Sequence, residues 1–206
     1  MSRSGREALD ALLERRDLTE DAAYELMVSL TDPAMAPAMT GALLAALRIK
    51  GATAAEVRGF ARAMRSLARR PGIPVDAPVA DVVGTGGDGS HSLNLSTGAA
   101  LLAAACGVRV AKHGNRSVSS RCGSADVLEA LGLALPLDER AAGECLDRTG
   151  FTFLFAPHYH PAMKAIAPVR QALGVRTIFN LLGPLSNPAQ APYALIGAWS
   201  LDIAEL

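Results

Sequence analysis

The chain has 206 residues, 50% of them hydrophobic, and it carries 20 basic and 20 acidic residues, so its net charge is zero. The apolar content argues against disorder and fits one full domain, or one small domain with part of a second. Zero net charge argues against a global field that draws nucleic acid or an anionic membrane, and no apolar run is long enough to span a membrane. We therefore expect a cytoplasmic protein. Its three cysteines, Cys106, Cys122 and Cys145, lack the spacing of a zinc site or a disulfide framework.

Residues 1–70 predict a domain of four helices with short connections. Thr19 precedes an acidic first turn, which is typical of a helix start. Asp32-Pro33 is typical of a cap followed by proline at the first helical position, and Thr53-Ala-Ala-Glu56 is a capping box before an apolar stripe. Nothing in this segment indicates catalysis, so we interpret it as a packing or dimerisation unit.

Residues 75–206 predict an α/β domain with a mainly parallel sheet. Helical segments alternate with short apolar strands, which we expect at 79–83, 108–111, 151–156 and 193–199. This alternation implies right-handed crossovers and a ligand site at the carboxyl ends of the strands. Ser96 or Thr97 is expected to cap the first helix. Four strands leave an exposed sheet edge, and 200–206 are typical of a helix start, so we expect a fragment with an incomplete α/β domain.

Two polar segments follow the first two expected strands. Gly84-Thr-Gly-Gly-Asp88 offers backbone N–H groups that no side chain covers, and Lys112-His-Gly-Asn-Arg-Ser-Val-Ser-Ser120 offers two cations and several hydroxyls. Because neighbouring parallel strands end at the same edge of a sheet, we expect the two segments to hold a diphosphate and a sugar phosphate together. Asp88 fits such a site if a metal or a ribose hydroxyl separates it from the phosphate; the alternative is that it only caps the loop.

Other polar residues leave alternatives open on the residues alone. His113 is as compatible with a structural role as with a catalytic one. His158 and His160 have a spacing sometimes seen at metals, but no further ligand cluster accompanies them. Arg170 alone is typical of an ordinary surface arginine.

Six motifs in order along the chain resemble the anthranilate phosphoribosyltransferase family. They are Gly84-Thr-Gly-Gly-Asp88, Asn94-Leu-Ser-Thr97, Lys112-His-Gly-Asn-Arg116, Gly123-Ser-Ala-Asp-Val127, His160-Pro-Ala-Met163 and Arg176-Thr-Ile-Phe-Asn-Leu-Leu-Gly-Pro-Leu185. The resemblance implies a helical domain and an α/β domain, dimerisation through the helical part, and magnesium as the cofactor. The implied reaction transfers the phosphoribosyl group of 5-phosphoribosyl 1-diphosphate to anthranilate, with release of diphosphate, in tryptophan biosynthesis.

The resemblance also implies residue roles, although it assigns no catalytic side chain. Contacts to phosphoribosyl diphosphate are implied for Gly84, Gly87, Asp88, Ser92, Asn94, Leu95, Ser96, Thr97, Lys112, His113, Gly114, Asn115, Arg116, Ser117, Val118, Ser119, Ser120 and Ser124. Anthranilate would contact Gly84, Asn115 and Arg170, whose guanidinium suits a carboxylate, and Ser96 would be a magnesium ligand.

The departures from the family and the competing interpretations are few. Ser117 and Cys122 stand where the family more often has Ala and Ser, and His91 places a longer side chain in the turn after Asp88 and would narrow that turn. The family's second magnesium position uses an Asp-Glu pair beyond Leu206, so we expect this chain alone to be poorly active. The alternatives are a pyrimidine nucleoside phosphorylase, whose loop after the lysine favours Ser-Thr-Gly-Gly, and a non-catalytic nucleic-acid-binding relative, which the zero net charge disfavours.

Overall fold

A computed structural model of the chain describes residues 3–86, 93–117 and 122–206 and divides into two compact units. The first, called the helical unit below, contains Met1–Ala68, His160–Ser186 and Leu206. The second, called the sheet unit, contains Arg69–Tyr159 and Asn187–Glu205. From the sequence we expected residues 160–186 in the α/β domain, whereas in the structure this segment packs in the helical unit. The two units are described separately.

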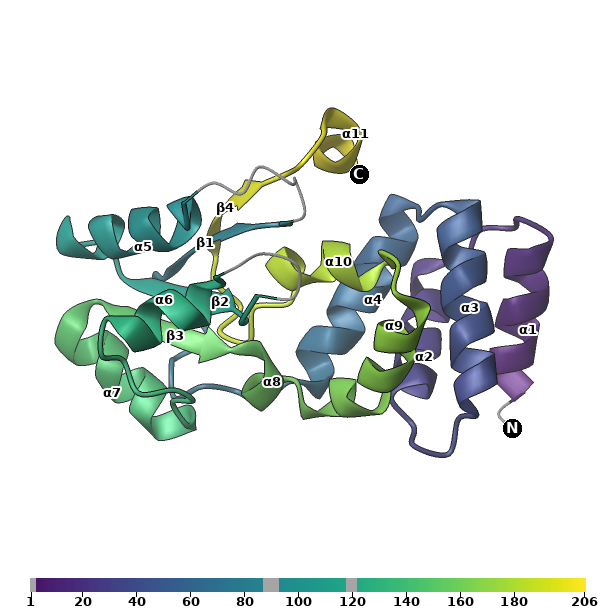
Figure 1. The fold of residues 1–206 in the computed structure, drawn as a ribbon, viewed down its shortest axis with the longest axis horizontal. Helices are drawn as coiled ribbons and strands as arrows, with labels where there is room; N and C mark the ends of the chain where they lie inside the picture. Colours follow the sequence, from purple (N-terminus) through teal and green to yellow (C-terminus); the bar gives the residue numbers. More distant parts are fainter. Residues whose placement is uncertain (1–2, 87–92, 118–121) are drawn as a thin grey trace. The chain divides into compact units, whose positions relative to one another are not determined.

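Four N-terminal helices and a later return of the chain build the helical unit (Figure 1). The helices are α1 (Arg3–Leu13), α2 (Glu20–Leu30), α3 (Pro37–Lys50) and α4 (Ala54–Leu67), and the returning elements are η1 (Pro161–Ala165), α9 (Ala167–Leu173), α10 (Phe179–Leu182) and η2 (Gly183–Leu185). Helix α2 packs along α4, α1 packs against α3, and the returning α9 and α10 contact α3 and α4. The four N-terminal helices confirm the fold expected for this region.

The expected caps explain two of the helix starts and fail at a third. The Thr19 hydroxyl accepts the Ala22 N–H at 3.2 Å, and Thr53 accepts the Glu56 N–H at 3.3 Å in a complete capping box. Helix α3, however, begins at Pro37 rather than at Asp32-Pro33. The Asp32 carboxylate instead accepts the Ala34 N–H at 2.8 Å, which closes a local turn and keeps this segment out of the helix.

The four described strands of the sheet unit form one parallel sheet in the order β3-β2-β1-β4 (Figure 1). They are β1 (Ala80–Gly84), β2 (Val110–Gly114), β3 (Phe151–Phe155) and β4 (Tyr193–Gly197). The chain moves outward from β1 through β2 to β3 and then returns to the other side of β1. This arrangement confirms the expected α/β fold, and it makes β1 the point where the strand order reverses.

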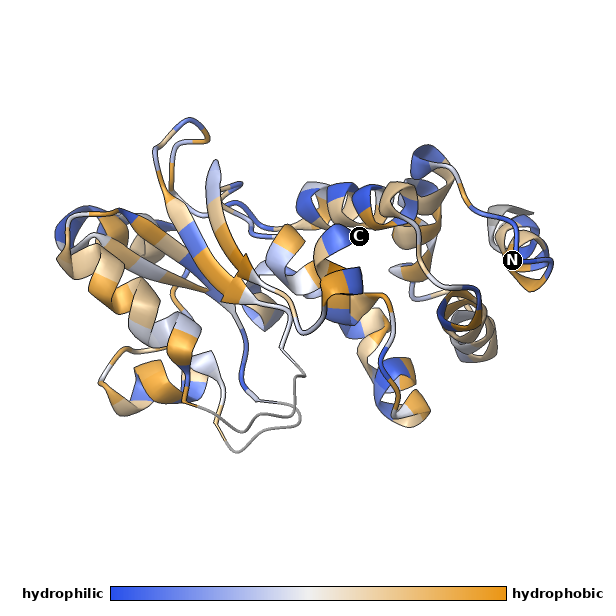
Figure 2. Ribbon diagram, turned by 90° about the horizontal axis from the view of Figure 1, so that it is seen from above, coloured by the Kyte–Doolittle hydropathy of each residue, from blue (hydrophilic) through white to orange (hydrophobic). Residues whose placement is uncertain are grey.

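Helices cover both faces of this sheet because successive apolar residues of its strands point to opposite faces. Helices α5 (Leu95–Ala105) and α6 (Ser124–Ala130) share a buried cluster with Val110 and Phe153. Helix α7 (Glu139–Thr149) shares another with Ala111 and Leu154, the residues that alternate with them. Figure 2 shows apolar residues along the strands. The remaining short helices of the unit are α8 (Ala156–Tyr159) and α11 (Leu201–Glu205).

The second strand lies further along the chain than the sequence predicted. We expected a strand at 108–111 followed by a loop from Lys112, but β2 runs from Val110 to Gly114. Its pairing with β3 continues to the end, where Gly114 lies opposite Phe155. Lys112 and His113 are therefore fixed by the backbone of a central strand. Among the described residues, no helix is long and apolar enough to cross a membrane.

Candidate functional site

The carboxyl ends of β1 and β2 form the candidate site, because these strands are parallel neighbours that pair at Ala80 and Val110. The first segment leaves β1 at Gly84, and the Thr85 N–H donates to the Gly197 carbonyl at 2.9 Å. Gly86 then takes a φ of 65°, a left-handed conformation that favours glycine. The second segment leaves the neighbouring strand at Gly114. Both segments therefore begin at the same edge of the sheet, next to the topological switch point.

Lys112 connects β2 to β1 and to the N-terminus of α5 from inside the sheet unit. Its side chain projects from β2, is only 1% exposed, and donates from Nζ to the Val82 carbonyl and, at 3.2 Å, to Ser96 Oγ. Ser96 lies in the first turn of α5, so the ammonium reaches the N-terminus of that helix. Burial lowers the pKa of Lys112 to about 8, and the charge of Asp81 offsets this only in part. The site thus holds a cation that is mostly protonated at neutral pH.

A buried polar network lies around Lys112 that the sequence did not reveal. Asp81 is 1% exposed and accepts the His113 N–H at 3.3 Å and the Asn187 side-chain amide at 2.8 Å. Asn187 also donates to the Ala111 carbonyl at 2.8 Å, so it joins β1 and β2. Burial raises the pKa of Asp81, although the Asn187 hydrogen bond and the Lys112 charge oppose this shift. The network fixes both strands directly beneath the site.

Asn94 links the N-terminus of α5 to the chain just after the second segment. It is the N-cap of α5, where Ser96 or Thr97 was expected, but its side chain does not cap the helix. Its amide Nδ2 donates instead to the Cys122 carbonyl at 3.2 Å. The N-terminus of α5 favours an anion because its backbone dipoles point their positive ends there.

Arg116 has carboxylate partners that the sequence reasoning missed. Its guanidinium donates to Asp126 at 3.2 Å and to both oxygens of Glu129, the second at 2.7 Å from Nη2. It also lies 5.6 Å from the centre of the Phe155 ring. Asp126 stands in the Gly123-Ser-Ala-Asp-Val127 motif, so the motif could have pointed to it, whereas nothing in the sequence indicated Glu129.

The structure brings some of the expected site residues together and separates others. Asn94, Ser96 and Lys112 converge, and Gly84, Gly114 and Asn115 lie at the beginnings of the two segments. Leu95 and Thr97 belong to the first turn of α5, and Ser124 begins α6. Arg170 lies on α9 of the helical unit, 5.0 Å from the centre of the Phe179 ring, and burial lowers its pKa. Gly87, Asp88, Ser92, Val118, Ser119 and Ser120 lie outside the described residues, as does His91.

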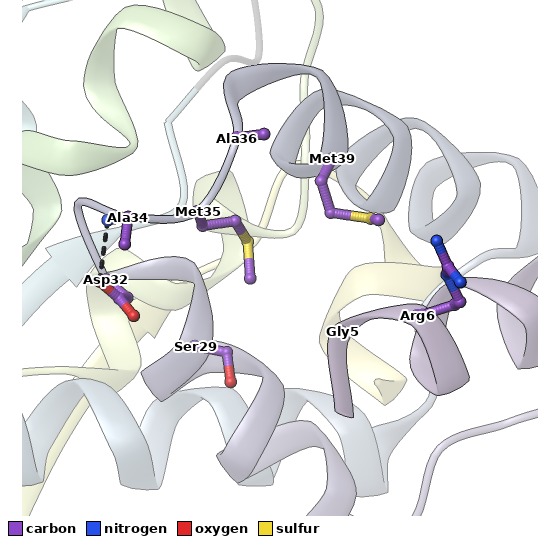
Figure 3. Close-up of a pocket in the computed structure, with 8 residues that line it drawn as sticks. All are labelled: Gly5, Arg6, Ser29, Asp32, Ala34, Met35, Ala36 and Met39. Atoms are coloured by element: carbon purple, nitrogen blue, oxygen red, sulfur yellow. Dashed lines mark hydrogen bonds between the residues drawn. The ribbon is translucent and has the colours of Figure 1, made fainter. Parts of the chain in front are cut away.

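Two further features of the described residues contribute nothing to this site. A pocket of about 140 Å³ in the helical unit is lined by residues of α1, α2, α3 and the connection between α2 and α3, with Met35 and Met39 pointing into it (Figure 3), and contains no expected site residue. His158 lies 3.6 Å from Glu139, whereas burial lowers the pKa of His160 to about 4. The described residues include no group of three or more His, Cys, Asp or Glu that could hold a metal.

Comparison with known families identifies the class of protein. The helical bundle domain of the glycosyl transferase family matches residues 6–68, and the a/b domain of that family matches residues 76–206. The chain therefore belongs to the glycosyl transferase family.

The individual relatives are anthranilate phosphoribosyltransferases. The chain is 50% identical to the enzyme of Chloroflexus aurantiacus over 97% of this chain and 58% of that protein, and 47% identical to that of Cupriavidus metallidurans over 98% and 59%. The crystal structure of the Thermus thermophilus enzyme matches with a TM-score of 0.88 and 50% identity over 95% of this chain and 59% of that one. The Saccharomyces cerevisiae enzyme in complex with PRPP and Mg matches with a TM-score of 0.88 and 25% identity over 100% and 61%. The chain thus spans less than two thirds of the length of these relatives.

Proposed function

We propose that the chain acts as an anthranilate phosphoribosyltransferase and that its sheet unit binds 5-phosphoribosyl 1-diphosphate. This enzyme transfers the phosphoribosyl group to the amine of anthranilate and releases diphosphate, the second step from chorismate in tryptophan biosynthesis. The observation that carries the proposal is the 3.2 Å contact between Lys112 Nζ and Ser96 Oγ, because it brings the buried cation of β2 to the N-terminus of α5, where an anion is favoured. The comparisons support this interpretation rather than a pyrimidine nucleoside phosphorylase or a nucleic-acid-binding relative.

The chemistry of the described residues suits a diphosphate leaving group. When the bond from C1 of the ribose to the diphosphate breaks, negative charge grows on the leaving group. Lys112 supplies a fixed cation held by a buried network, and the α5 N-terminus supplies oriented N–H groups. These groups are in place before the reaction, so they need little reorganisation as charge develops. The backbone at Gly84 and from Asn115 to Ser117 completes the proposed contacts among the described residues.

Magnesium fits the proposed site through Ser96. Its hydroxyl is a hard oxygen ligand, it is partly exposed, and it lies at a helix terminus where phosphate oxygens would add further ligands. Mg²⁺ in nucleotide and phosphate sites commonly takes only one or two protein ligands, with substrate oxygens and water as the rest. When bound, the ion would neutralise part of the negative charge of the diphosphate. Lys112, which shares the Ser96 oxygen, would orient that hydroxyl towards the ion.

Anthranilate requires a partner for its carboxylate and a defined position for its amine. We assign the carboxylate to Arg170, since a planar guanidinium can donate two parallel hydrogen bonds to it. Phe179 supports this guanidinium at 5.0 Å and limits its orientations. The aromatic amine is already a neutral nucleophile, so its placement by Gly84 and Asn115 matters more than a strong general base.

We also propose a cytoplasmic homodimer that associates through the helical unit. Two large apolar side chains at the C-terminal ends of α1 and α3 support this: Leu13 is 67% exposed and Ile49 is 71% exposed. Sedimentation of the purified chain tests the dimer, with Leu13→Glu as the variant expected to dissociate it. A monomer at all concentrations would contradict this part of the proposal.

Isothermal titration of phosphoribosyl diphosphate with Mg²⁺ tests the proposed ligand directly. We expect saturable binding that Lys112→Met weakens. A fluorescence assay of anthranilate consumption, run on the same protein, measures turnover separately. A chain that stays folded and shows no heat of binding would overturn the proposal.

A further inference from the structure

One carboxylate joins Ser117, in the second segment, to Gly123, which lies just after that segment. Asp126 Oδ2 accepts the Gly123 N–H at 2.7 Å and the Ser117 N–H at 3.2 Å. These two amides flank residues 118–121, which lie outside the described residues. A single side chain of α6 therefore holds the backbone of Ser117 close to that of Gly123.

The backbone at Ser117 and Gly123 approaches so closely that glycine is required. A Cβ atom on Gly123 would lie 2.2 Å from the Ser117 amide nitrogen and 2.5 Å from the Arg116 carbonyl carbon. No side chain fits at such distances without moving backbone. The close approach brings both amides to the same carboxylate oxygen, so Gly123 and Asp126 act on one feature of the backbone.

Asp126 also belongs to a wider set of contacts that hold the start of the segment. The Ala125 N–H donates to the Asn115 carbonyl at 3.3 Å, and Arg116 Nη1 donates to Asp126 Oδ1 at 3.2 Å. The two backbone hydrogen bonds, from Gly123 first and then Ser117, keep the pKa of Asp126 below its ordinary value, so it is ionised at neutral pH. Glu129 pairs with the same guanidinium but accepts neither of the two backbone N–H groups.

We propose that Asp126 is a positioning residue for the phosphate-binding backbone at Arg116 and Ser117. It does not contact the ligand; it fixes the backbone that does, and thereby lowers the conformational cost of binding. The inference rests on the proposed function, since the ligand it serves is phosphoribosyl diphosphate. The Arg116 guanidinium pairs with both Asp126 and Glu129, but only Asp126 accepts the backbone N–H groups of Ser117 and Gly123.

A helix cap alone does not account for these contacts. The Gly123–Asp126 bond spans three residues and is what an acidic side chain in the first turn commonly makes at a helix start. The bond to Ser117, nine residues away, adds nothing to α6. Its effect falls on the segment before the helix, and this distinguishes a positioning role from stabilisation of the helix.

Three variants separate the contributions. Asp126→Ala removes every acceptor, Asp126→Asn keeps one oxygen that can face both N–H groups, and Glu129→Gln weakens only the pairing with Arg116. Isothermal titration with phosphoribosyl diphosphate and Mg²⁺ measures the affinity for this ligand, and a separate titration measures the affinity for anthranilate. Thermal unfolding shows whether each variant is folded. Amide proton shifts of Ser117 and Gly123 in the ligand-free protein give a signature that does not depend on the ligand.

We expect Asp126→Ala to lower the affinity for phosphoribosyl diphosphate about tenfold or more. This is the range seen when a residue that supports a ligand contact is lost. Anthranilate affinity should stay within about twofold, Asp126→Asn should restore most of the loss, and Glu129→Gln should match the wild type. The Ser117 and Gly123 amide protons should shift upfield in Asp126→Ala. If Asp126→Ala unfolds, the test compares Asp126→Asn with Glu129→Gln. The quantities compared are the affinity for phosphoribosyl diphosphate and the amide proton shifts of Ser117 and Gly123.

Several results would overturn the inference. Equal diphosphate affinity in wild type and a folded Asp126→Ala would refute it while leaving the proposed function intact. An equal loss for both substrates, or no recovery in Asp126→Asn, would reduce Asp126 to a structural role. A wild-type chain that binds no phosphoribosyl diphosphate, yet shows the amide signature, would instead refute the proposed function and this role with it.

Discussion

Raising the pH above about 8 should weaken the binding of phosphoribosyl diphosphate, because the buried Lys112 ammonium loses its proton there. The pKa of this lysine falls to about 8 since burial disfavours the charged form, and Asp81 restores only part of the loss. With that pKa, the protonated fraction in the free protein drops about tenfold between about pH 7 and about pH 9. The dissociation constant should therefore rise by about the same factor over this range.

The stability of the folded protein should change in the opposite direction from ligand affinity as the pH rises. The folded pKa lies below the unfolded value of 10.5, so between about pH 8 and 10.5 the unfolded chain binds more protons. The lysine thus makes the folded state more stable as the pH rises through this window, by up to about 3 kcal/mol. Weaker binding at high pH is consequently not a result of unfolding at this residue.

The assay is isothermal titration with Mg²⁺ at several pH values on the wild type and on Lys112→Met. Methionine has similar length and no charge, so it suits the buried position. The variant should bind more weakly at neutral pH and show a flat profile, since the titrating group is gone. A wild-type profile that is flat between about pH 7 and about pH 9 would refute the reasoning, as would an equal slope in the variant.

Three further predictions concern single residues. Gly123→Ala should lower the affinity for phosphoribosyl diphosphate about tenfold, because the new Cβ would lie 2.2 Å from the Ser117 nitrogen. An unchanged affinity by titration would contradict the close approach of Gly123 to Ser117. Asn187→Ala should lower the free energy of unfolding by about 2–3 kcal/mol, since it removes the amide donor from two buried acceptors, Asp81 Oδ2 and the Ala111 carbonyl; urea denaturation measures this, and a loss below about 0.5 kcal/mol argues against the network. Glu56→Ala should cost about 3–5 kcal/mol by the same method, because the fully buried carboxylate pairs with Lys50 at 2.9 Å. Its control, Glu144→Ala in the exposed pair with Arg140, should change stability by less than about 1 kcal/mol, and similar losses for the two variants would contradict the argument from burial.

The features that could be predicted from the sequence are those whose causes are local. Thr19 and the Thr53-to-Glu56 capping box mark helix starts because their hydrogen bonds span three residues. The alternation of strands and helices indicated the parallel sheet, since a helix between two successive strands lets both run in the same direction. The two segments at neighbouring strand ends followed from this topology, and Asn94, Ser96 and Lys112 do converge there.

The features that could not be predicted depend on partners far away in the chain. The extent of β2 is decided by its pairing with β3, so Lys112 and His113 belong to a strand rather than a loop. The buried Asp81 finds its amide partner 106 residues later, at Asn187, where a polar residue before proline is typical of any turn. The return of 160–186 to the helical unit likewise depends on packing, for example of Phe179 against Phe60 at 6.5 Å between ring centres.

The most direct test of the central claim compares the intact ligand with its two halves. Titrations with phosphoribosyl diphosphate, ribose 5-phosphate and inorganic diphosphate, each with Mg²⁺, measure whether both segments bind one molecule. If the segments after β1 and β2 form a single site, the intact ligand should bind at least about 100-fold more tightly than either half, because the second contact becomes intramolecular. An intact ligand that binds no better than diphosphate alone would mean that the two segments do not act together.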